Sequence, residues 1–161
     1  MSASFTKQNS PRRDLRGRGV AAFGLVASLG LVAVPALAED PAPDAVALGR
    51  AIYAASCASC HGANLEGQPD WKRRLANGRM PAPPHDASGH TWHHSDQDLF
   101  LITREGVGSI VPGYESDMPA FRGILSDDEI RAVLAYIKST WPEKQRGYQA
   151  EVTRNDTPEG G

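Results

Sequence analysis

The sequence predicts an all-α domain with three main helices joined by long loops. Three segments carry apolar residues at helical spacing, whereas no convincing β-branched run with strand-like alternation occurs. Stretches rich in Gly, Pro and Asn separate these segments and are typical of loops. A two-cysteine motif that can attach haem directly follows the first helical segment.

Residues 1–38 have the pattern of a cleavable export signal. Four arginines, beginning with Arg12-Arg13, precede an apolar run over 20–34, and Ala36-Leu37-Ala38 forms a small-x-small cleavage site. We expect a Sec-type signal, with a twin-arginine signal as the alternative. The apolar run is about 15 residues, shorter than the roughly 20 that a membrane-spanning helix needs, so a membrane contact requires that it be retained as an anchor. The expected mature protein begins at Glu39 and is periplasmic or otherwise exported.

The first and last helices are expected to cross closely. The first begins near Asp44, a candidate N-cap, and places Gly49 and Tyr53 on one face because they are four residues apart. A glycine inside a helix costs on the order of 1 kcal/mol relative to alanine, which favours a close approach of another helix at that point. The last helix opens with the capping box Ser126-Asp127-Asp128-Glu129 and carries Tyr136, which can add an aromatic contact to the crossing.

A third helix is expected between these two. Ser95 is its candidate N-cap, with Asp98 in the capping-box position, and Gly106 closes it. The flanking segments 64–89 and 107–117 are dense in turn-forming residues and are expected to be loops. Long loops in so small a domain need a surface to lie against, and a haem would supply one.

The segment Cys57-Ala58-Ser59-Cys60-His61 can form two thioether bonds to one haem and place an imidazole against its iron. A redox dithiol or half of a zinc site is the alternative for such a cysteine pair. A zinc site of this kind needs further ligands at comparable spacing, and the chain has no other cysteine. The motif therefore predicts one haem c, held by Cys57 and Cys60, with His61 as an iron ligand.

A methionine is the expected second iron ligand, because a His/Met pair raises the reduction potential into an electron-transfer range. Past the signal, only Met80 and Met118 are available. Met118 precedes the last helix, at the end of a loop that can carry it over the far face of a haem. Met80, a histidine or an open site remain as alternatives.

Over residues 44–141 the sequence resembles a class I cytochrome c. The resemblance rests on the haem motif through Gly62, on Met118-Pro119-Ala120-Phe121 and on Tyr136-Ile137-Lys138 in the last helix. It implies an all-α fold, electron transfer between redox protein partners through an exposed haem edge, and His61 and Met118 as proximal and distal ligands. It also implies that a proline carbonyl accepts a hydrogen bond from the His61 ring, and we expect Pro84 rather than Pro83 in that role.

The segment 79–94 departs from short members of that family. It places His85, His90, His93 and His94 close together. Imidazoles at this density suit copper or zinc, but we expect solvated loop residues, one of which could bind a haem propionate. Further candidate donors to the propionates are Trp92, Arg104 and Tyr114.

Charge narrows the choice of partners. Removal of residues 1–38 takes away five of the 17 Lys and Arg and one of the 19 Asp and Glu, which leaves 12 basic and 18 acidic residues and a net charge of −6. An acidic protein does not favour nucleic acid as a partner. Lys72-Arg73-Arg74 and Arg79 form the single basic patch, which we expect to be a solvated turn. Residues 142–161 are expected to be a polar, mobile tail, and the protein a monomer.

Three functions are consistent with these residues. The favoured function is a diffusible single-electron carrier rather than an enzyme. A peroxidase-like haem enzyme would need an open sixth position on the iron and a distal acid or base. A copper-binding redox module would use the His85–His94 cluster. Tight metal binding or turnover of peroxide would distinguish the second and third functions from the first.

Overall fold

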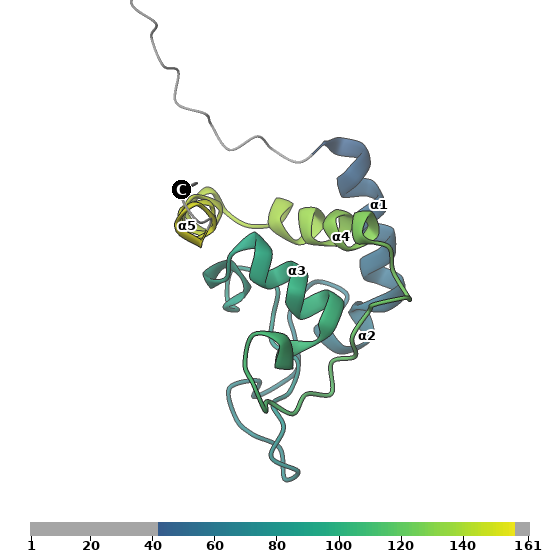
Figure 1. The fold of residues 1–161 in the computed structure, drawn as a ribbon. Helices are drawn as coiled ribbons and strands as arrows, with labels where there is room; N and C mark the ends of the chain where they lie inside the picture. The colour runs from purple at the N-terminus through teal and green to yellow at the C-terminus, as the bar shows by residue number, and fades with distance from the viewer. Residues whose placement is uncertain (1–41, 157–161) are drawn as a thin grey trace, which may run out of the picture. The chain divides into compact units, whose positions relative to one another are not determined.

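The computed structural model describes residues 42–156, so the expected export signal lies outside the described residues. Within that range the helices, in chain order, are α1 (Pro43–Ser56), α2 (Ala58–His61), η1 (Thr91–His93), α3 (Asp96–Glu105), η2 (Val107–Ser109), α4 (Asp127–Ser139) and α5 (Glu143–Asp156) (Figure 1). The described residues form no strand, and their only β-type pairing is the isolated bridge between Arg122 and Leu125. The all-α prediction is confirmed. No helix in this part of the chain is both long and apolar enough to cross a membrane.

Helix α1 begins two residues earlier than expected. Its N-cap is Ala42, Pro43 occupies the first helical position, and Asp44 lies inside the first turn. The prediction that Asp44 caps the helix is therefore wrong. Proline is well suited to the first position because its missing N–H would have no helical partner there. Asp44 instead places its negative charge near the positive end of the helix dipole.

Helices α1 and α4 cross in close contact, as the glycine in α1 predicts. A Cβ atom on Gly49 would overlap the carbonyl group of Ala132 and would lie 2.9 Å from Cβ of Tyr136. One turn further along α1, the rings of Tyr53 and Tyr136 pack with their centroids 5.5 Å apart. Ile52, Tyr53, Val133 and Ile137 are buried in one apolar core at this crossing. The absence of a side chain at Gly49 is what allows the two backbones to approach.

Helix α3 has the caps that the sequence predicts. The Ser95 side chain accepts a hydrogen bond from the Asp98 amide at 3.1 Å, and Gly106 follows the last turn with a φ of 89°. Ion pairs tie this helix to α4, since Lys138 binds Asp96 at 2.7 Å. Helix α4 has the complete capping box of Ser126 and Glu129.

The predicted mobile tail is wrong for the residues that form α5. Gln149 is 1 % exposed and donates hydrogen bonds to the His94 carbonyl at 3.3 Å and to the Asp96 carboxylate at 2.7 Å. Ser95 donates to Asp156 at 2.5 Å, near the other end of the helix. Helix α5 is thus docked through these polar groups and through Tyr148, whose ring packs edge-on against Trp92 and His93. Its sequence has no apolar residues at regular helical spacing, so the helix is not evident from the sequence pattern.

Candidate functional site

The haem motif continues the end of α1 as a short second helical turn. The Cys57 amide bonds to the Tyr53 carbonyl at 2.9 Å, and the His61 amide bonds to the Cys57 carbonyl at 2.9 Å. The Cys57 side chain is half-buried and Cys60 is exposed, and the two thiols form no disulfide. Burial and the neighbouring Cys60 raise the pKa of the Cys57 thiol to about 11. The helical turn brings both sulfur-bearing side chains and the histidine into one short segment, as haem attachment requires.

His61 is held in the orientation of a metal ligand. Its side chain is buried, and Nδ1 lies 2.8 Å from the Pro83 carbonyl oxygen. Because a carbonyl oxygen can only accept, Nδ1 carries the proton and Nε2 is left with a free lone pair. Burial lowers the pKa of His61 despite the opposing effect of this hydrogen bond. The ring is therefore neutral and able to bind iron near neutral pH.

The carbonyl partner of His61 is Pro83, and the expected choice of Pro84 is wrong. The Pro84 carbonyl is instead contacted by the Thr91 hydroxyl at 3.4 Å. Consecutive carbonyl groups in an extended loop point in different directions, so only one of two adjacent prolines can face the ring. The spacing from His61 alone does not decide which of the two does so.

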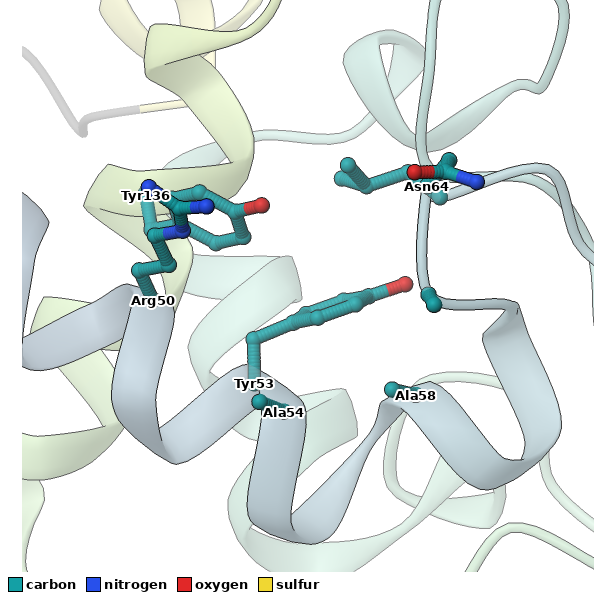
Figure 2. Close-up of a pocket in the computed structure, with 8 residues that line it drawn as sticks. Arg50, Tyr53, Ala54, Ala58, Asn64 and Tyr136 are labelled. Atoms are coloured by element: carbon teal, nitrogen blue, oxygen red, sulfur yellow. The ribbon is translucent and has the colours of Figure 1, made fainter.

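Tyr53 supports the backbone of the same turn. Its hydroxyl donates to the carbonyls of Gly62 at 3.0 Å and of His61 at 3.3 Å, and burial raises its pKa above the ordinary value. Figure 2 shows its ring reaching from α1 into a pocket, with Tyr136 and Asn64 above it in this view. This pocket therefore adjoins the backbone of the haem motif.

The two candidate methionines lie on loops that are tied together. Met80 and Met118 are both half-buried. Arg79, directly before Met80, forms an ion pair with Asp117, directly before Met118. Figure 1 shows the two long loops at the same end of the fold, away from α5. The Met118 amide is further anchored by the Ser116 hydroxyl at 3.0 Å. The structure thus brings both candidates to neighbouring loops.

Of the three predicted propionate donors, Trp92 has a buried donor without a partner. Its Nε1 is enclosed and makes no hydrogen bond with any of the described residues. Arg104 instead pairs with Asp127 at 2.9 Å and with Glu105 at 2.5 Å, so its charge is already neutralised. Tyr114 is half-buried. A buried indole N–H is costly unless it finds an acceptor, and a haem carboxylate would be one. The residues present therefore fit a haem.

The histidines of the 85–94 segment do not converge on a common point. Within residues 42–156, no group of three or more His, Cys, Asp or Glu side chains is arranged to hold a metal ion. Each of three imidazoles instead packs on a different aromatic ring, as follows: His85 on His61 at 4.0 Å, His90 on Trp71 at 5.4 Å and His93 on Trp92 at 3.7 Å between centroids. Among the described residues, these three imidazoles thus pack on aromatic rings, and their arrangement adds no support to the alternative of a copper site.

Comparison with known proteins gives an independent result. A model of the family described as cytochrome c matches residues 46–141, more than half of the chain. Cytochrome c6 of Tetradesmus obliquus is 32 % identical over 96 residues, which cover 57 % of this chain and 86 % of that protein. No solved structure gives a significant match. Together with the haem motif, these matches show that the chain belongs to the cytochrome c family and is an electron carrier with one covalently attached haem c.

Proposed function

We propose that this cytochrome transfers single electrons between redox proteins outside the cytoplasm, with its iron bound by His61 and Met118. The observation that carries the proposal is the orientation of His61, whose buried ring donates from Nδ1 to Pro83 and leaves Nε2 free. The bound haem supplies a ferrous/ferric couple. The protein's part is to hold a neutral imidazole and a thioether in fixed positions, so that little rearrangement accompanies the gain or loss of an electron.

Met118 is proposed as the second ligand because of where its loop is anchored. Its segment is held at the Ser116 hydroxyl, and the chain then bonds back to α3, where the Phe121 amide donates to the Thr103 carbonyl at 3.1 Å. The Met80 segment pairs with the Met118 loop through Arg79, but directly after Met80 it is anchored near His61, because the Ala82 amide donates to the Gln68 side chain at 2.9 Å. A loop anchored on the His61 side is less suited to supply the ligand opposite that histidine.

The partner is proposed to be another redox protein that docks over an exposed haem edge. The exposed side chains Lys72, Arg73 and Arg74 form a basic turn on an otherwise acidic mature protein. A basic turn of this kind would attract an acidic surface on the partner protein, and such attraction speeds the encounter of the two proteins more than it strengthens their complex. We also propose that residues 1–38 are removed on export, and the mass of the secreted protein tests this by showing whether it begins at Glu39.

Optical spectra of the ferric and ferrous protein test the iron ligands. The wild type should be low-spin and show the weak far-red ferric band implied by its resemblance to His/Met cytochromes. Met118→Ala should abolish that band, whereas the matched variant Met80→Ala should keep it. A high-spin wild type would indicate an open sixth position and favour a peroxidase-like enzyme. Loss of the band in Met80→Ala alone would assign the ligand to Met80.

A further inference from the structure

A second imidazole lies flat against the ring of His61. The ring centroids of His61 and His85 are 4.0 Å apart, and the two planes differ by 22°. Such a distance and angle describe face-to-face contact rather than a chance approach of side chains. The hydrogen bond from His61 Nδ1 to Pro83 fixes one atom of the ring, but the ring can still pivot about that bond. A stacked neighbour restricts this remaining freedom.

His85 is itself anchored by three elements of the fold. Its amide donates to the Leu65 carbonyl at 2.8 Å, and its carbonyl accepts from Trp141 Nε1 at 2.7 Å. Its ring nitrogen Nδ1 lies 2.8 Å from the Thr91 hydroxyl. Both the backbone and the ring plane of His85 are therefore held. A fixed ring can transmit its orientation to the ring stacked on it.

The ring of His85 also interacts with the charge carried by His61. Part of the positive charge of a ferric centre spreads onto the imidazole that binds it, and an aromatic face attracts positive charge. An aromatic face against His61 therefore stabilises the oxidised state more than the reduced state.

We propose that His85 is a positioning residue that fixes the plane of the His61 ring and lowers the reduction potential of the iron bound to it. The inference rests on His61 being the proximal ligand, as proposed above. It adds a role for a residue outside the set of ligands and thioether cysteines. Thr91 is the hydroxyl that sets the rotation of the His85 ring.

Three variants of the haem-loaded protein test this role. His85→Leu removes the aromatic face, His85→Phe keeps a face but loses the contact with Thr91, and Thr91→Val keeps the histidine but frees its ring. The matched control is His90→Leu, because His90 stacks on Trp71 rather than on His61. The measurements are the midpoint potential and the proton NMR spectrum of the ferric form, in which the spread of the haem methyl shifts reports the plane of the axial imidazole.

The expected result is an upward shift of the potential and an altered spread of methyl shifts in His85→Leu. His85→Phe should retain most of the wild-type potential, Thr91→Val should alter the methyl shifts, and His90→Leu should change neither quantity. Unchanged potential and methyl shifts in His85→Leu would overturn the inference. If that variant does not fold, unchanged methyl shifts in Thr91→Val would do so. A wild-type spectrum without His61 ligation would overturn both this inference and the proposed function, whereas a low-spin wild type with unresponsive variants would overturn this inference alone.

Discussion

Replacement of Gly49 by alanine tests the close crossing of α1 and α4 directly. A Cβ at this position would lie 2.5 Å from the Ala132 carbonyl carbon and 2.9 Å from Tyr136 Cβ, so it would meet backbone that cannot move aside as a side chain can. The substitution gains about 1 kcal/mol of intrinsic helix propensity. Overpacking typically costs about 1–3 kcal/mol, and the upper end, about 3 kcal/mol, applies here because the backbone of α4 would have to shift. We therefore expect Gly49→Ala to lower the free energy of unfolding by about 2 kcal/mol net.

The matched control is Gly147→Ala in α5. A Cβ on Gly147 would have no atom within 4 Å, so only the gain in helix propensity applies there. That variant should be more stable than the wild type by up to about 1 kcal/mol. Guanidinium unfolding of the haem-loaded proteins, followed by circular dichroism, measures both changes. Equal stabilisation of the two variants would refute the tight contact between α1 and α4.

Three further predictions concern other parts of the fold. Ser126→Ala removes the hydroxyl that accepts from the Glu129 amide and donates to the Glu129 carboxylate, and it should lower the unfolding free energy by about 1 kcal/mol in the same assay. Arg122 and then Arg104 lower the pKa of Glu105 in the folded state, so this carboxylate contributes stability above its unfolded pKa of 4.5 and loses it as the pH falls through the lower folded value. Unfolding measured at a series of pH values from about 5 downwards should show a decline that is shallower in Glu105→Gln. Trp92→Phe keeps the aromatic contacts but removes the Nε1 donor. Because an unbonded propionate leaves more negative charge near the iron, the midpoint potential should fall, and an unchanged potential would place that donor away from the haem.

Much of the fold can be predicted from local patterns. The caps of α3 at Ser95 and Gly106 and the capping box of α4 act over a few residues, so the sequence specifies them directly. The close crossing at Gly49 can be predicted because glycine destabilises a helix interior, and a close approach of another backbone is a structural cause for it at such a position. Aspartate is favoured both as an N-cap and in the first turn of a helix, so Asp44 alone does not fix where α1 begins. Pro43 does fix it, because proline is favoured at the first helical position and therefore places Asp44 inside the first turn.

Helix α5 and the histidines show where such patterns fail. Docking of α5 depends on hydrogen bonds from Gln149 to residues more than 50 positions away, and polar contacts of this kind leave no apolar period in the sequence. The histidines at 85–94 have the composition of a metal site, but their side-chain directions depend on the path of the loop. The path of the loop also decides which of the Pro83 and Pro84 carbonyls faces His61, and the sequence does not specify that path.

The orientation of the proximal histidine depends on parts of the chain far from its own motif. The haem motif places His61 in the chain, but the direction of its ring is set by Pro83 and His85 in the following loop. That loop is held in turn by Trp141, beyond the end of α4, through a hydrogen bond to the His85 carbonyl. Because α4 is itself fixed against α1 at Gly49, the contact between these helices and the orientation of the His61 ring are parts of one packed structure. A substitution at the helix crossing should therefore disturb the ligand as well as the stability, which links the two sets of measurements proposed above.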